Sequence, residues 1–315
     1  MTVSTNTNTA PDVPAAVVPA PAGGSVAGPR RTPARMALRR FRRNKLAVAG
    51  AAVLGLVVVL AVFAPLIAQH SPNQVDLDAL RRGPSGTHWF GTDSSGRDVF
   101  SRVVHAGRVS LLVGVSAALI SVVIGTLLGA VAGLVGGVVD SAVMRLADVV
   151  LSFPTVIAIV VLAGVLGPSV TMLVIAIGAT HWPQACRVVR GVALGLREQD
   201  YLHAARAGGA GPWWLVRKHI VPASLPPVAV SATLAVAQAV LLEATLSFLG
   251  LGVQPPQASW GNMLNDAQSL TLIESAPWMW LPPGMAIAVT VLSVNFVGDG
   301  LRDAGDPRQS KGARR

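Results

Sequence analysis

The stretch "LAVAGAAVLGLVVVLAVFAPLIA", from Leu46 to Ala68, contains no charged side chain in 23 residues. At a rise of 1.5 Å per residue, a helix of this length reaches about 34 Å, enough to cross a hydrocarbon core of about 30 Å. A secretory signal has an apolar core of only about 7–15 residues near its start, so the stretch predicts an uncleaved membrane span.

Apolar runs of this kind recur along the whole chain. Of its 315 residues, 52% are hydrophobic and only 13% are charged, whereas a soluble domain carries about 25% charged residues. The pattern predicts an all-α, polytopic membrane protein, with one domain over residues 35–308 and six transmembrane helices. The six spans are expected at about residues 46–68, 109–135, 146–166, 169–190, 228–250 and 281–300. Residues 1–34 are expected to form a disordered tail, and residues 309–315 a short basic tail.

The basic residues indicate how the spans are oriented. With both termini in the cytoplasm, residues 69–108 and 251–280 are extracytoplasmic, and residues 196–225 form a cytoplasmic loop. Five of the 25 lysines and arginines then fall outside, which leaves 25 − 5 = 20 at or near the inner face, as the positive-inside rule requires. These five are Arg81, Arg82, Arg97, Arg102 and Arg108. Because topology accounts for the net charge of +10, nucleic acid is not expected as a partner.

One stretch between the fourth and fifth expected spans differs from its surroundings: "HAARAGGAGPWWLVRKHIVP", from His203 to Pro222. Gly208 and Gly209 are expected to end a first short helix. Pro212 is placed to begin a second helix and Pro222 to end it. A basic and aromatic helix of this kind either rests on anionic membrane lipid or docks against a cytoplasmic partner, and composition alone leaves both open.

The spacing of Ala204-Ala205, Gly209 and Ile220-Val221-Pro222 resembles the EAA loop of permease subunits in bacterial ATP-binding-cassette (ABC) importers. The resemblance implies a coupling helix that sits in a groove of a separate ATPase subunit. The chain departs from the family pattern at His203, which stands where the first Glu is expected. The coupling residues implied are Tyr201, His203, Ala204, Ala205, Gly209, Trp213, Trp214, Arg217 and Pro222.

Four further stretches resemble the C-type permease of the dipeptide, oligopeptide and nickel import group. They are "FGTDSSGRDVFSRVVHAGRVSL" (Phe90–Leu111), "MRLADVVLSFP" (Met144–Pro154), "LLEATLSFLGLGVQPPQASWGNML" (Leu241–Leu264) and "NFVGDGLRDAGDPR" (Asn295–Arg308). Together the resemblance extends from about residue 36 to 308 and implies a type I ABC importer permease fold in a bacterial inner (plasma) membrane. Peptide is the leading substrate class, and nickel or another small solute is the alternative.

The resemblance also implies the partners. They are a sister B-type permease subunit, one or two cytoplasmic ATP-binding subunits and an extracytoplasmic substrate-binding protein. The chain has no GxxxxGK[ST] loop and no nucleophile–base pair, so it is not expected to be an enzyme by itself. No cofactor is expected in this chain, and ATP and magnesium are expected in the ATPase subunits.

The stretch "GTDSSGR" lacks the GK[ST] ending of a phosphate-binding loop, so it is interpreted as a glycine-rich turn that leads into an interfacial helix. By resemblance it belongs to an outer vestibule near the docking site of the binding protein. The vestibule residues are Gly91, Thr92, Asp93, Gly96, Arg97 and Asp98.

Inside the fifth span, Glu243 is an intramembrane acid, and such residues are functional candidates. Glu243 and Ser247 either line the translocation pathway, or Glu243 pairs with a neighbouring helix. His181 and His219 have no second ligand at metal spacing, so no metal site is predicted.

A ridge of glycines, Gly125, Gly129, Gly133 and Gly137, is expected to let two helices approach closely, either within this subunit or at a sister permease. Two functions of other classes remain as alternatives. One is an ion-coupled secondary transporter, although no internal repeat is evident. The other is a membrane-anchored scaffold or receptor that holds the basic insert at the surface.

Overall fold

The computed structural model describes residue 2 and residues 33–305. The predicted tail over residues 1–34 lies almost entirely outside this part, and the tail over residues 309–315 lies wholly outside it.

The described residues form helices joined by turns, and among them the single β-type contact is an isolated bridge between Thr92 and Asp98. The helices are α1 (Pro33–Arg43), α2 (Lys45–Val62), α3 (Ala64–Ile67), η1 (Leu77–Ala79), α4 (Val99–Val135), α5 (Gly137–Ser152), α6 (Thr155–Leu166), α7 (Val170–Arg197), α8 (Asp200–Ala207), α9 (Pro212–Leu215), η2 (Val216–Ile220), α10 (Val221–Phe248), α11 (Trp260–Asp266), α12 (Leu270–Ser275) and α13 (Pro277–Gly305). The all-α fold class is confirmed for this part of the chain.

Four helical stretches in the described part are long and apolar enough to cross a membrane: α2, α4, Pro212–Phe248 and α13. The pair α5 and α6 meets the same criterion when the two helices are counted together, but they are bent by 82°. The helix α7, with 28 residues, is about 42 Å long and has the length of a span, although it carries several arginines. These six units agree with the predicted number of spans.

The expected third span, residues 146–166, is not one straight helix. Phe153, which precedes Pro154, has φ −89° and ψ 134° and breaks the helix there. The ring of a proline disfavours the helical conformation at the residue before it, which accounts for the break.

The helix boundary expected at Pro222 is wrong. The backbone continues from Pro212 through the π-helical turn η2 into α10, and Pro222, Pro226 and Pro227 all lie within the helical stretch. A proline ring normally clashes with the carbonyl four residues earlier, and the wider π turn just before Pro222 makes room for it. The helix that contains the predicted fifth span therefore begins at the surface insert, before residue 228.

Glycines bring α4 and α7 into backbone contact. A Cβ atom on Gly125 would lie 2.6 Å from the carbonyl oxygen of Trp182, and one on Gly133 would lie 2.9 Å from that of Arg190. A Cβ atom on Gly129 would overlap the carbonyl oxygen of Cys186. These three glycines therefore pack within the subunit. Gly137 does not belong to this ridge, because it lies beyond the end of α4, has φ +57° and has open space around it.

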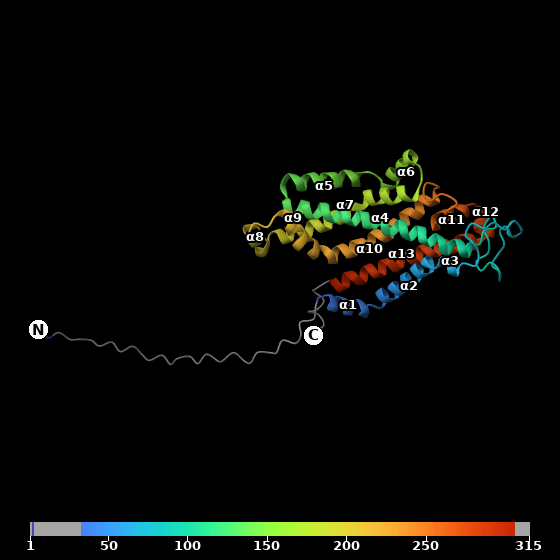
Figure 1. The fold of residues 1–315 in the computed structure, drawn as a ribbon, viewed down its shortest axis with the longest axis horizontal. Helices are drawn as coiled ribbons and strands as arrows, with labels where there is room; N and C mark the ends of the chain where they lie inside the picture. Colours follow the sequence, from blue (N-terminus) through green and yellow to red (C-terminus); the bar gives the residue numbers. More distant parts are fainter. Residues whose placement is uncertain (1, 3–32, 306–315) are drawn as a thin grey trace.

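The long helices run side by side and place two short-helix regions at opposite ends of the bundle (Figure 1). One end carries α8 and α9, and the other carries α3, α11 and α12. The insert and the glycine-rich turn of residues 91–98, which leads directly into α4, thus lie far apart.

Candidate functional site

The insert between α7 and α10 is fixed to the bundle by its apolar residues. Leu202, Leu215 and Ile220 are almost completely buried and pack with residues of α4 and α7. Those residues are Ala130, Leu134, Val189 and Ala193. The burial of about three large aliphatic side chains stabilises the position of α8 and α9 by several kcal/mol, at roughly 1.5–3 kcal/mol each.

The opposite face of the insert is aromatic and basic. Trp213 is 62% exposed, Trp214 49% and Tyr201 48%. The ring of His219 lies between two of them, with its centroid 5.6 Å from that of Tyr201 and 5.3 Å from that of Trp214. Exposed large aromatic residues of this density are typical of a surface that contacts a partner or a lipid headgroup region. We call Tyr201, Trp213, Trp214 and His219 the aromatic surface.

The remaining predicted coupling residues lie around this aromatic surface. His203, Ala204, Arg217 and Pro222 are exposed, and Ala205 is half-buried. The glycine turn was correctly predicted, since α8 ends at Ala207 and Gly209 has φ +84°, a conformation that favours glycine. The amide of Ala210 donates to the carbonyl of Ala205 at 3.0 Å, which closes the turn.

At the other end, residues 91–98 form a compact turn. Thr92, Asp93 and Asp98 are buried, and Gly91 and Gly96 have φ +71° and +78°. Asp93 Oδ1 accepts from the backbone amides of Ser95 and Arg97 at 2.8 and 2.9 Å. Asp98 Oδ2 accepts from the amide of Ser101 at 2.8 Å and caps α4, which agrees with a turn that leads into a helix. These contacts explain why α4 begins at Val99, earlier than the predicted residue 109.

Two arginines connect this turn to α11. Arg97 Nη2 and Arg102 Nη2 each lie 3.2 Å from Asp266 Oδ2, and Arg97 Nε lies 2.7 Å from Asp93 Oδ2. Burial raises the pKa of the Asp266 carboxyl above its ordinary value, and the positive charges of Arg102 and Arg97 oppose that rise. The turn and α11 are therefore held as one unit.

A polar cavity of about 250 Å³ opens beside these ion pairs. Its lining includes Arg97, Arg102, Gln254, Asn262 and Asp266, with Ser247 from α10. The structure thus brings together one predicted vestibule residue, Arg97, and one predicted pathway residue, Ser247.

Glu243 does not line this cavity, because its side chain is completely buried. Ser247 donates a hydrogen bond to Glu243 Oε1 at 2.7 Å, whereas Glu243 Oε2 is buried and has no hydrogen-bond partner among the described residues. The hydrogen bond from Ser247 lies within α10 and does not join Glu243 to a neighbouring helix, so both roles of Glu243 stay predictions. Ser247 thus joins the buried Glu243 to the lining of the cavity.

Comparison with known proteins decides the family. Residues 125–311 match the binding-protein-dependent transport system inner membrane component, and residues 32–84 match the N-terminal TM domain of oligopeptide transport permease C. The chain belongs to the binding-protein-dependent permease family. It is thus a multi-pass inner membrane permease subunit of an ABC transporter, with the type I permease fold.

Three relatives illustrate how much of the permease is shared. A peptide permease protein of Brucella suis biovar 1 is 46% identical over 276 residues, which cover 88% of this chain and 91% of the relative. A dipeptide transport system permease protein of Alkalihalophilus pseudofirmus is 41% identical, with 88% and 90% covered. An oligopeptide transport system permease protein of Escherichia coli K12 is 43% identical, with 86% and 90% covered.

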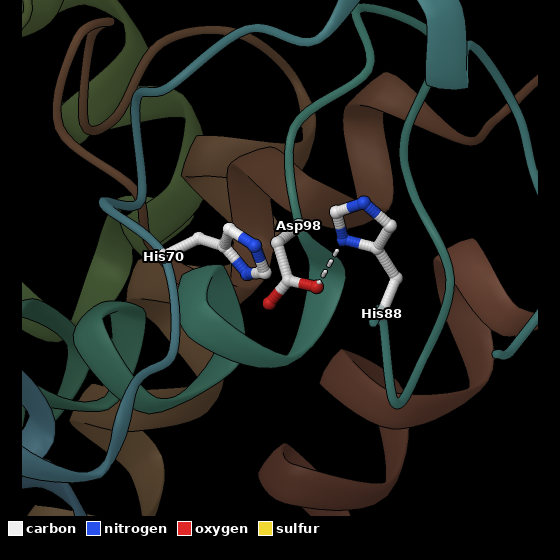
Figure 2. A group of neighbouring side chains, drawn as sticks. All are labelled: His70, His88 and Asp98. Carbon is white, nitrogen blue, oxygen red and sulfur yellow. Dashed lines mark hydrogen bonds and ion pairs between the residues drawn. The ribbon is translucent and has the colours of Figure 1, made fainter. Parts of the chain in front are cut away.

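The permease also contains a cluster that the sequence analysis missed: His70, His88 and Asp98 (Figure 2). Their ligand-type atoms lie within 4.8 Å of one another, and the two imidazole rings stack with centroids 4.8 Å apart. Asp98 Oδ1 lies 2.9 Å from His88 Nδ1, while its other oxygen caps α4. Both oxygens of Asp98 therefore have protein partners, and the cluster fastens the residue 69–98 loop to the first turn of α4. The separation of these residues in sequence follows no ligand motif, so spacing alone does not reveal the cluster.

Proposed function

We propose that this permease forms half of the translocation pathway of an ATP-driven importer for di- or oligopeptides. The relatives named above as peptide, dipeptide and oligopeptide permeases match nearly the whole chain, which supports the substrate class. The other half would be a sister B-type permease subunit. One or two cytoplasmic ATP-binding subunits, which hold ATP and magnesium, would drive the cycle, and an extracytoplasmic binding protein would deliver the peptide.

The orientation follows from the charge distribution. Placing both termini and the α8–α9 end in the cytoplasm leaves most lysines and arginines at the inner face. The turn of residues 91–98, α11 and the polar cavity beside Arg97 and Ser247 then face outward, where the binding protein docks.

The single observation that carries the mechanism is the aromatic surface on an insert that is continuous with α10. Closure of the ATPase subunits on ATP would move the insert, and because Pro212–Phe248 is one helical stretch, α10 would move with it. In this proposal Tyr201, Trp213, Trp214 and Arg217 contact the ATPase groove, and Gly209 sets the angle between α8 and α9. The pathway would alternate between inward-open and outward-open states.

The test uses the permease assembled with its sister subunit, ATPase subunits and binding protein in liposomes. We expect ATP-dependent uptake of a labelled dipeptide and none of Ni²⁺. Uptake of Ni²⁺ in place of the dipeptide would reassign the substrate. Peptide uptake that needs no ATPase subunit would support an ion-coupled secondary transporter, and absence of any uptake would support a scaffold.

The coupling role has a matched pair of variants. Gly209→Val introduces a β-branched side chain at φ +84°, which is strained. Gly211→Val, at φ −70° and also with open space around it, is the control. Gly209→Val is expected to lose ATP-driven uptake while it still inserts in the membrane. Equal uptake by the two variants would contradict the coupling role.

A further inference from the structure

A second groove, mostly apolar but with four polar side chains, lies between α4, α7 and α10, near the middle of α7 and α10. It has a volume of about 170 Å³ and is lined by Ser121, His181, Gln184 and Ser231 together with apolar residues that include Val188 and Leu234. It shares no lining residue with the cavity beside α11.

This groove is on an outer face of the subunit. Gln184 is exposed, His181 and Ser231 are half-buried, and the neighbouring Leu234 is 47% exposed. Two of the three helices, α4 and α10, belong to stretches apolar enough to span a membrane. A glutamine amide and an imidazole are costly against acyl chains, so this face is expected to contact water or protein and not lipid.

The hydrogen-bonding capacity of the groove is only partly used. His181 Nδ1 lies 3.0 Å from the carbonyl oxygen of Ile177, which only accepts. The proton is therefore assigned to Nδ1, which leaves Nε2 as an acceptor. In the described part of the chain, the side-chain amide of Gln184 has no hydrogen-bond partner. Ser231 Oγ donates to the carbonyl of Pro227 at 3.1 Å and retains its capacity to accept.

We propose that this groove binds the backbone of the transported peptide, with Gln184 and His181 as the residues that contact it. Each peptide unit offers one N–H donor and one C=O acceptor. The amide of Gln184 complements both groups, and His181 Nε2 accepts a further N–H. Contacts to the backbone do not depend on the peptide side chains, so the groove accepts peptides of varied sequence. This inference rests on the proposed function of peptide import.

Transport by the assembled importer tests the binding role. Gln184→Leu and His181→Leu keep the approximate size and remove the polar groups, and each is expected to lower peptide uptake about three- to tenfold, as expected for one lost hydrogen bond. His181→Gln, which retains an acceptor, is expected to keep most of the uptake. The control is Thr245→Val, an exposed hydroxyl on α10 outside the groove.

The readouts separate the possible failures. The ATPase rate stimulated by peptide-loaded binding protein is expected to remain in all these variants, because the groove is remote from the aromatic surface. Leucine variants that take up peptide as fast as Thr245→Val would overturn the groove assignment alone. Failure of the unmodified importer to take up peptide would instead contradict the proposed function.

Access of water to the groove is a second, independent measurement. The single cysteine, Cys186, is buried, and a Cys186→Ala background allows one new cysteine to be labelled. In the assembled importer, Gln184→Cys is expected to react with a charged, membrane-impermeant thiol reagent at least tenfold faster than Leu119→Cys, which replaces a 62% exposed leucine on α4. Equal, slow labelling at both positions would mean that lipid or the sister subunit covers the groove, and would overturn the proposal.

Discussion

Arg102 Nη2 lies 3.2 Å from Asp266 Oδ2, an ion pair that joins the first turn of α4 to α11 across 164 residues of sequence. The Arg102 side chain is 4% exposed and that of Asp266 40%. A nearly buried guanidinium depends on its carboxylate partners, because few water molecules reach it.

Arg102→Met is expected to destabilise the permease by about 1–3 kcal/mol, since it removes the guanidinium that lies between Asp93, 3.5 Å away, and Asp266. Thermal unfolding in detergent measures the change. The control is Glu274→Gln, an exposed acid on α12. Equal unfolding temperatures for the two variants would show that the ion pair contributes nothing measurable.

Asp266 also predicts a dependence on pH. Its pKa in the folded protein is raised by burial, so the folded state holds the proton more tightly than the unfolded state does. By linkage, the contribution of Asp266 to stability falls as the pH rises from the ordinary pKa of 3.8 through the raised value. The stability difference between the wild type and Asp266→Asn is expected to change in that window, and unfolding measured from pH 4 upward would reveal it. A constant difference would argue against the raised pKa.

The close approach of α4 and α7 predicts a steric effect. Gly129→Leu is expected to prevent correct packing, because a Cβ atom at this position already overlaps the backbone of Cys186. Gly55→Leu, on α2 with open space around its Cβ position, is the matched control. The yield of folded, monodisperse permease after solubilisation distinguishes them, and comparable yields would contradict the packing described.

The aromatic surface predicts a loss of partner binding without a loss of stability. Trp213→Ala is expected to weaken association with the ATPase subunits by tenfold or more, as for an exposed aromatic anchor worth about 1.4 kcal/mol or more. Trp89→Ala removes another exposed tryptophan, at the opposite end of the bundle, and serves as control. Co-purification of the ATPase subunits under increasing salt measures the effect. Retention in Trp213→Ala equal to that in Trp89→Ala would favour a lipid-facing role for the insert.

The helical cap at Asp98 predicts a difference between two substitutions. Asp98→Asn keeps an oxygen that accepts from the Ser101 amide, whereas Asp98→Ala removes it. Asp98→Ala is expected to cost about 1–2 kcal/mol more than Asp98→Asn in unfolding experiments. Equal losses of stability in the two variants would show that the contact of Asp98 with His88, and not the hydrogen bond to the Ser101 amide, stabilises the fold.

Local sequence signals predicted much of the fold. Long charge-free runs identify the spans. The residues Gly208, Gly209 and Pro212 identify the turn between α8 and α9. Both signals are readable because each depends only on residues that are neighbours in the sequence. The sequence analysis missed the bend at Pro154 and the continuation of the helix through Pro222. A proline can either end a helix or lie within it, and the outcome depends on the backbone conformation just before it, which is extended at Phe153 and π-helical before Pro222. The His70, His88 and Asp98 cluster depends on contacts between separate segments of the chain, which no local pattern encodes.

The glycine contacts between α4 and α7 leave no intervening layer of side chains, so the two helices have little freedom to slide past each other. Ser121 and His181 therefore lie on a fixed wall of the groove between α4, α7 and α10. The opposite wall belongs to α10, which is part of the continuous helical stretch Pro212–Phe248 that also contains Trp213. If the surface around Trp213 moved, α10 would move while α4 and α7 stayed in place, and the width of the groove would change. The movement of the insert and the release of the peptide would then occur in the same step.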